Sequence, residues 1–213
     1  GISHPFTFHA PTMGVFHSTD YNCLRKDKGE VKKYISQLNH FGYYYNQIKT
    51  YLESEFNSKS IPAYVGIDSE LISGREFIES KTVRPCSTMH ILYVGKGIIR
   101  KNVDTSIDAV KKLPFPAEVT LVGDGPEKEN RRKMAEGRDN IHFAGYVPRE
   151  KVIEYMRSSD VFVMVSHTET FGLVYLEALA QGCITIGSRD EGIDGIIQDG
   201  ESGFLIKAGS VSE

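Results

Sequence analysis

The sequence has few cysteines, little net charge and no long apolar run. Its three cysteines, Cys23, Cys86 and Cys183, are widely spaced and contain no C-x-x-C pair. This pattern favours reduced thiols in a cytoplasmic protein over a disulfide framework or a zinc site. The net charge of -3 gives no general reason to expect nucleic acid as a partner. The longest clean apolar run, 161–165, is far shorter than the roughly 18 residues of a membrane helix.

Familiar nucleotide-binding signatures are also missing. The glycine-containing turn at 95–102 (GKGIIRKN) fits neither G-x-x-x-x-G-K-[ST] nor G-x-G-x-x-G, so it is neither a P-loop nor a dinucleotide fingerprint. There is no internal repeat and no low-complexity tract. Its 213 residues suit one sizeable domain, or one domain with part of a second.

From residue 89 onward, short β-branched runs alternate with helical patterns. Such alternation is typical of βαβ units and a parallel sheet. We expect strands at 89–95, 118–123, 140–143, 160–165, 183–187 and 203–206, and helices at 103–112, 126–137, 148–158 and 171–181. The sequence therefore predicts an α/β fold over 89–213, with a Rossmann-like, doubly wound parallel sheet.

The first 88 residues predict a short, incomplete and α-rich segment. We expect a strand at 14–17, helical stretches rich in tyrosine over 30–56, and extended chain at 61–65, where Pro62 disfavours a helix. Residues 73–88 have the composition of a loop or linker. Residues 1–12 precede Met13, and we expect them to be an expression scar before a native start, or a disordered end.

The turn at 95–102 carries three cations between a predicted strand and a predicted helix. Ligands of parallel α/β sheets bind at the carboxyl ends of strands. Gly95 gives the turn flexibility, and Lys96, Arg100 and Lys101 supply charge that suits a diphosphate. The alternative is a solvated basic turn.

Two further turns follow predicted strands. Gly123, beside Asp124, allows backbone to approach a ligand, although a tight turn with Asp124 capping the next helix explains the same residues. In the turn at 143–148 (FAGYVP), Tyr146 is expected to stack on a base. The alternative is a partly exposed tyrosine that covers the sheet edge.

The turn at 166–173 leads into a helix and carries two acids, Glu169 before the helix and Glu177 inside it. The stretch 172–177 spans roughly 7–8 Å, so the carboxylates can reach different parts of an extended ligand. A carboxylate among apolar residues is costly unless it is paired or bound, which favours a functional Glu177. In the alternative interpretation, Glu169 is an ordinary acid that is favourable near a helix start, and Glu177 is a surface residue. Phosphate can also bind the unpaired N–H groups of Phe171, Gly172 and Leu173.

Together these turns resemble the C-terminal, donor-binding domain of family 4 retaining glycosyltransferases, which have the GT-B fold. Residues 169–177 are similar to the family's E-x7-E element, and 95–102 to its G-R-L-x3-K-N phosphate loop. The segment 61–68 (IPAYVGID) resembles the hinge strand that joins the two domains. Further similar markers lie at 122–126, 143–145 and 199–205.

The resemblance implies transfer of a sugar from a nucleoside-diphosphate sugar to an unknown acceptor, with retention at the anomeric carbon. Lys96 and Lys101 would hold the diphosphate in place of a metal ion, so no cofactor and no metal are expected. Glu169 would contact the sugar, and His17 would face it from the N-terminal domain. The donor-binding residues implied in this way are Gly95, Gly123, Asp124, Tyr146, Thr170, Phe171, Gly172, Leu173 and Glu177.

The resemblance also divides the chain. It implies a reduced N-terminal domain with the hinge strand over 13–72, a linker over 73–88 and a nucleotide-sugar-binding domain over 89–213. Two departures stand out: Lys96 replaces the family's arginine, which removes the bidentate fork, and most of the acceptor domain is missing. We therefore expect either an excised fragment or a small enzyme that a second copy or an acceptor-domain partner completes.

Two alternative functions remain. In the first, the chain is a nucleotide-sugar-binding subunit without activity of its own. In the second, it is another GT-B enzyme such as a nucleotide-sugar epimerase. The tyrosine-rich stretch 41–45 and the basic stretch 25–33 are interpreted as a solvated amphipathic helix. The alternative is a surface that meets a partner or, peripherally, an anionic membrane.

Overall fold

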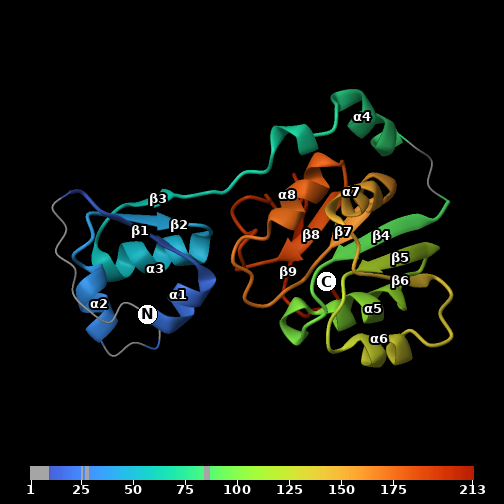
Figure 1. The fold of residues 1–213 in the computed structure, drawn as a ribbon, viewed down its shortest axis with the longest axis horizontal. Helices are drawn as coiled ribbons and strands as arrows, with labels where there is room; N and C mark the ends of the chain where they lie inside the picture. The colour runs from blue at the N-terminus through green and yellow to red at the C-terminus, as the bar shows by residue number, and fades with distance from the viewer. Residues whose placement is uncertain (1–9, 25, 27–28, 84–86) are drawn as a thin grey trace.

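The computed structural model describes residues 10–24, 26, 29–83 and 87–213. The chain forms two lobes joined by the segment that follows β3 (Figure 1). A three-stranded sheet with the order β1-β2-β3 lies in the N-terminal lobe, and a six-stranded sheet with the order β6-β5-β4-β7-β8-β9 lies in the C-terminal lobe. Most of 1–12, Cys86 and part of 25–33 lie outside the described residues, as do the expectations made for them.

The C-terminal lobe confirms the predicted Rossmann-like parallel sheet, because all of its neighbouring strands pair in parallel. Its strands are β4 (Met89–Val94), β5 (Ala117–Val122), β6 (Ile141–Gly145), β7 (Val161–Val163), β8 (Ile184–Ser188) and β9 (Phe204–Ile206). Its connecting helices are α5 (Val103–Val110), α6 (Lys128–Met134), α7 (Arg149–Ser158) and α8 (Leu173–Ala180). Each predicted element is present, with ends that differ by a few residues.

The order of the strands creates a switch point between β4 and β7. From β4 the chain builds outward through β5 to β6, and then returns to the other side of β4 to form β7, β8 and β9. The connections after β4 and β7 therefore diverge to opposite sides at the same edge of the sheet. In open α/β sheets this crevice, at the carboxyl ends of the strands, is where ligands bind.

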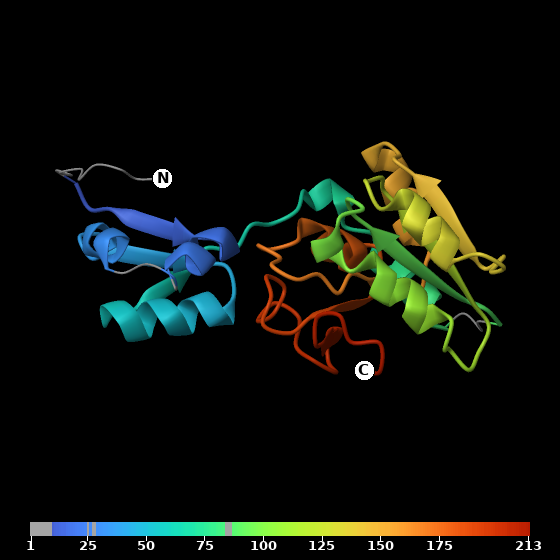
Figure 2. The same ribbon diagram turned by 90° about the horizontal axis from the view of Figure 1, so that it is seen from below.

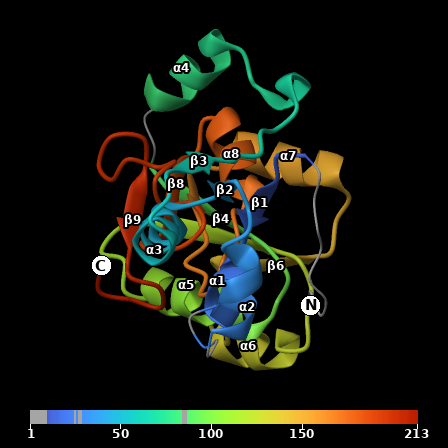
Figure 3. The same cartoon turned by 90° about the vertical axis from the view of Figure 1, so that its left-hand side faces the viewer.

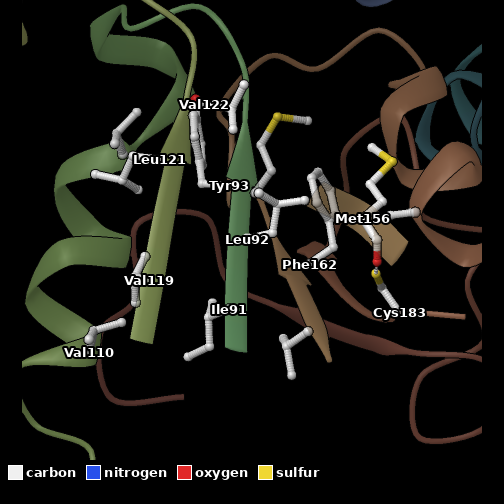
Figure 4. Close-up of a cluster of buried hydrophobic side chains, with 14 of the residues drawn as sticks. Ile91, Leu92, Tyr93, Val110, Val119, Leu121, Val122, Met156, Phe162 and Cys183 are labelled. Carbon is white, nitrogen blue, oxygen red and sulfur yellow. Dashed lines mark hydrogen bonds between the residues drawn. The ribbon is translucent and has the colours of Figure 1, made fainter. Parts of the chain in front are cut away.

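A continuous apolar core holds this sheet between its helices (Figure 4). Leu92 of β4 and Phe162 of β7 are fully buried, as is Met156 of α7. Burial of each such side chain stabilises the fold by about 1.5–3 kcal/mol. The core therefore fixes the strand ends from which the candidate site is built.

The N-terminal lobe is α/β rather than only helical. Its strands are β1 (Met13–Phe16), β2 (His40–Tyr43) and β3 (Ser60–Pro62), and its helices are α1 (Ser18–Leu24), α2 (Glu30–Ile35) and α3 (Asn46–Phe56). The expected strand at 14–17 and the expected helices are present, but β2 interrupts the stretch that was expected to be helical. This segment forms a strand because of its tertiary contacts. A Cβ on Gly42 would lie 3.0 Å from Val15 Cγ2 of the neighbouring strand, so glycine lets β1 and β2 pack closely there.

The tyrosine-rich stretch 41–45 covers the end of β2 and the two residues after it, and most of it belongs to the core of this lobe. Phe41, Tyr43 and Tyr45 are buried, so the interpretation of this stretch as a solvated helix was wrong. The same burial removes it as a surface for a partner or a membrane. Within the part of the chain that the structure describes, no helix combines the length and the apolar character needed to cross a membrane.

The segment 73–88, expected to be a loop, contains the helix α4 (Arg75–Val83). Lys81 Nζ donates to the carbonyls of Gln181, at 2.9 Å, and Met156, at 3.1 Å. Ser73 Oγ donates to Gln181 Oε1 at 2.7 Å. These bonds tie the segment to α7 and the end of α8, beside which α4 lies in two views (Figures 1 and 3). The expectation failed because it is this docking, not local propensity, that stabilises the helix.

Candidate functional site

Three turns at the carboxyl ends of β4, β5 and β6 are joined by backbone hydrogen bonds. The N–H of Gly95 donates to Val122 O at 3.0 Å, and the N–H of Gly97 donates to Asp124 O at 2.9 Å. The N–H of Gly123 donates to Gly145 O at 2.7 Å. The predicted lysine turn and the two glycine turns therefore form one surface at the top of the sheet.

Glycine is required at these turns by the way they pack. Gly123 has a φ of 122°, and a Cβ there would lie 2.0 Å from the carbonyl oxygen of Gly95. A Cβ on Gly125 would lie 2.3 Å from Gly97 O. Other residues rarely adopt such a φ, and no side-chain movement can relieve a clash with backbone. The glycines thus have a structural use, and close approach to a ligand stays a prediction.

Lys101 and Glu169 meet at the switch point between β4 and β7. Lys101 ends the single 3-10 turn Ile99–Lys101 after β4, and Glu169 lies in the loop after β7. Their side chains form an ion pair and are only 15% and 10% exposed, respectively. Asn102, in the left-handed conformation with a φ of 49°, donates from Nδ2 to Val165 O at 2.7 Å. Two residues predicted to bind different parts of one ligand are thus adjacent.

The other two cations of the lysine turn differ in their surroundings. Arg100 donates from Nη1 to Thr168 O at 3.0 Å and accepts the His167 N–H at 2.7 Å through its carbonyl. It therefore helps to hold the loop after β7. Lys96 is exposed and, among the described residues, makes no side-chain hydrogen bond or ion pair. Of the two predicted phosphate-binding lysines, one is paired and the other faces solvent.

The start of α8 offers backbone donors beside this ion pair. In the described part of the chain, the N–H groups of Phe171, Gly172 and Leu173 have no hydrogen-bond partner. Gly172 has a φ of 76°, and a Cβ there would lie 2.4 Å from the Tyr175 ring. The free N–H groups lie at the positive end of the helix dipole, where an anion binds favourably. This agrees with the predicted place for phosphate.

Glu191, which was not among the predicted site residues, holds the loop that carries Glu169. Its Oε1 accepts the Thr168 N–H at 2.8 Å and its Oε2 accepts the Glu169 N–H at 2.6 Å. Burial raises the pKa of Glu191, and the neighbouring Glu169 raises it further. A signal existed in the sequence: the acid follows a predicted strand, at the sheet edge where ligands bind.

Glu177 is paired with a residue from a neighbouring helix. Arg149 Nη2, at the start of α7, lies 2.5 Å from Glu177 Oε1. The Glu177 side chain is 13% exposed and that of Arg149 is 62% exposed. The burial cost that favoured a functional Glu177 is therefore offset by its pairing with Arg149, which was not predicted. Binding of ribose by Glu177 stays a prediction.

Asp124 and Tyr146 lie on the solvent-facing side of the surface. Tyr146 is 82% exposed, so it does not cover the sheet edge, and its ring is free to stack. Asp124 Oδ1 accepts the Gly125 N–H at 2.8 Å, and this bond is the main reason why the pKa of Asp124 is lowered. The helix α6 begins at Lys128, after its N-cap Glu127, so the alternative in which Asp124 caps that helix was wrong.

His17 reaches the site through a row of aromatic rings. It follows β1, and its ring centroid lies 4.5 Å from that of Tyr44, which follows β2. The Tyr44 ring lies 5.6 Å from Phe171, and the Tyr64 ring lies 6.3 Å from Phe171. These residues place the carboxyl end of the N-terminal sheet against the loop before α8, between the lobes of Figure 2. A role for His17 toward a sugar stays a prediction.

Cavity size alone does not identify this site. A hollow of about 30 Å³ lies beneath the glycine turns, where Tyr93, Gly97 and Arg131 are among the residues that line it. A larger hollow of about 680 Å³ lies against β4, β7, β8 and β9, and none of the predicted site residues lines it. The candidate site is instead marked by topology and by the polar groups that converge at the switch point.

A parallel α/β sheet with a lysine, a carboxylate and free helix N–H groups at its switch point defines a class of phosphate- and nucleotide-binding domains. The family described as Glycosyl transferases group 1 matches residues 74–213. The chain belongs to this family, which confirms the resemblance seen in the sequence. The match includes α4, which the predicted division assigned to a linker.

The curated relatives are considerably longer than this chain. Sulfoquinovosyl transferase SQD2 of Arabidopsis thaliana is 33% identical over 156 residues, which cover 70% of this chain and 30% of the relative. N-acetyl-alpha-D-glucosaminyl L-malate synthase of Bacillus anthracis is 35% identical over 117 residues, which cover 53% of this chain and 30% of the relative. The chain thus spans under half the length of the curated relatives it matches.

Solved structures support the fold of both lobes. Sucrose-phosphate synthase from Thermosynechococcus elongatus superposes with a TM-score of 0.74 at 21% identity, covering 96% of this chain and 56% of that one. Anabaena HepE in complex with UDP superposes with a TM-score of 0.71 at 18% identity, covering 95% and 60%. At such identities the likeness establishes the GT-B glycosyltransferase fold alone.

Proposed function

We propose that this chain binds a nucleoside-diphosphate sugar and forms the donor-binding part of a glycosyltransferase that retains anomeric configuration. The observation that carries the proposal is the meeting of Lys101 and Glu169 at the switch point, beside the free N–H groups at the start of α8. A cation and backbone donors suit a diphosphate. An adjacent carboxylate suits sugar hydroxyls, because it accepts hydrogen bonds only.

The geometry suggests how the ligand would lie. The diphosphate would sit at the start of α8, where Lys101 is close, and the exposed Lys96 of the same lysine turn would also bind it. Glu169 would then accept from the sugar, while Glu177 and Tyr146 lie further along for ribose and base. Because Lys101 and Glu169 are already nearly desolvated, their charges act at low dielectric, where electrostatic stabilisation is strong.

The leaving diphosphate would be stabilised by Lys96, Lys101 and the helix N-terminus in place of a metal ion. Fixed cations aimed at developing negative charge need no reorganisation during the reaction. Two structural neighbours support this class of donor: HepE was solved with UDP and glucose, and the pneumococcal transferase GtfA with UDP and GlcNAc. For this chain, a UDP or GDP sugar is therefore the first donor to test.

Calorimetric titration of the chain with UDP and GDP tests the proposal. Wild type should bind one of them, and Lys101→Met should weaken that affinity by about a hundredfold, the effect of one preorganised charge of roughly 3 kcal/mol. Lys133→Met, which removes an exposed lysine of α6, is the matched control and should leave affinity unchanged. Equal affinities for all three proteins would contradict the proposal.

A second possibility is that the chain binds the donor without catalysing transfer. An assay of the chain alone for donor hydrolysis and for transfer distinguishes the two. Donor binding without either activity would show that these 213 residues bind the donor but do not catalyse transfer.

A further inference from the structure

The loop that carries Glu169 has little regular structure of its own. It joins β7 to α8, and Thr168 within it adopts a φ of 57°, in the left-handed region. Such a conformation costs about 1–3 kcal/mol and persists only where surrounding groups impose it. The position of the Glu169 carboxylate therefore depends on contacts from outside the loop.

The turn after β8 supplies those contacts. Glu191 accepts the N–H groups of Thr168 and Glu169, one on each carboxylate oxygen. The next residue, Gly192, donates its N–H to Glu169 O at 3.1 Å. A Cβ on Gly192 would lie 2.4 Å from the carbonyl carbon of Thr170. Residues 191 and 192 thus hold the loop through both donors and acceptors.

The turn that carries Glu191 is itself braced. Asp190 has a φ of 62°, and its N–H donates to Asp194 Oδ2 at 2.7 Å. The N–H of Asp194 donates in turn to Glu191 O at 2.8 Å. A braced turn transmits the position of β8 to the loop after β7.

We propose that Glu191 is a positioning residue for donor-sugar binding, acting through the backbone of Thr168 and Glu169; this rests on the proposed function.

The chemistry of the contact requires a carboxylate. An ionised glutamate offers two acceptor oxygens to two N–H donors, whereas a glutamine offers one acceptor and directs its NH2 at the other donor. Hydrogen bonds to a charged acceptor are also about twice as strong as neutral ones. Glu191→Gln should therefore displace Glu169 while leaving side-chain volume almost unchanged.

Charges around Glu191 give the contact a pH dependence. The groups that face it are Glu169 and His167 of the held loop, Tyr175 of α8 and Tyr45 of the N-terminal lobe. Burial raises the pKa of Glu191 above that of an ordinary glutamate. The stability of the folded state therefore falls as pH rises from the ordinary pKa of glutamate to this raised pKa. The ionised form of Glu191 holds the loop that carries Glu169. This positioning is therefore lost as pH falls and Glu191 becomes protonated.

The test compares ligands with and without a sugar: UDP-glucose against UDP, and GDP-mannose against GDP. Glu191→Gln should weaken the binding of the nucleotide sugar about tenfold, which is the effect of one lost charge-assisted hydrogen bond. It should weaken the binding of UDP or GDP less than about threefold. Glu201→Gln, an exposed acid of a neighbouring turn, is the control. Equal weakening of both ligands, or of neither, would overturn the inference.

A second measurement covers the case in which Glu191→Gln fails to fold. Amide proton shifts of Thr168 and Glu169 in the wild-type protein, followed by NMR as pH falls, should titrate together at a midpoint above that of an ordinary glutamate. Shifts that titrate separately, or not at all, would overturn the inference. If wild type binds neither UDP nor GDP, the proposed function fails, and the NMR titration still decides the contact itself.

Discussion

The two sides of the candidate site differ in how much of their structure exists before any ligand arrives. On the inner side, at the switch point, Lys101 and Glu169 are nearly buried and paired, and Glu191, in the turn after β8, holds the loop that carries Glu169. On the outer side, Asp124 and Tyr146 are exposed and lie on turns held mainly by backbone bonds. The inner side is preorganised for charge, whereas the outer side presents exposed side chains on turns that the backbone holds.

The glycine turns connect these two sides, and breaking their contact should have the largest effect. Gly123→Ala places a Cβ against the Gly95 carbonyl and strains a φ of 122°, so it should destabilise the C-terminal lobe by about 3–5 kcal/mol. Urea unfolding followed by circular dichroism measures this. Gly66→Ala, where nothing lies within 4 Å of the added Cβ, is the control and should change stability by less than about 1 kcal/mol. Similar losses of unfolding free energy for Gly123→Ala and Gly66→Ala would show that the contact between the glycine turns does not stabilise the lobe.

The ion pair of the inner side should have the next largest effect on stability. Lys101→Met leaves the Glu169 carboxylate buried without its partner, which should cost about 2–3 kcal/mol. Lys101→Met combined with Glu169→Gln removes both charges and should recover all but roughly 1 kcal/mol of that loss. Thermal unfolding of the single and double variants checks this. Failure of the second substitution to restore stability would mean that Lys101 acts through other contacts.

The outer side should show a small effect, visible only with ligand. Tyr146→Ala should change the free energy of unfolding by less than about 0.5 kcal/mol, because the residue is 82% exposed. It should weaken binding of UDP or GDP by about 1 kcal/mol if the ring stacks on the base, and leave binding of inorganic pyrophosphate unchanged. Loss of pyrophosphate binding would instead place Tyr146 beside the phosphates.

The elements that were predicted well share a physical cause. The strands of the C-terminal lobe are apolar runs bounded by glycine and proline, and their periodicity follows from burial on both faces of a parallel sheet. β2 and α4 were missed because their stability comes from neighbours: β2 lies between β1 and β3, and α4 is held through Lys81 by the end of α8. Local sequence carries little information about such contacts.

For the site, the sequence by itself determined the chemical types and their order along the chain: the lysine turn, the glycine turns and the acids 169 and 177. Only the tertiary structure decided which of them meet. It joined Lys101 to Glu169 across the switch point, paired Glu177 with Arg149 and brought Glu191 under the loop. The physical reason is that a parallel sheet gathers the ends of strands distant in sequence at one edge, in an order that the residues of each turn do not encode.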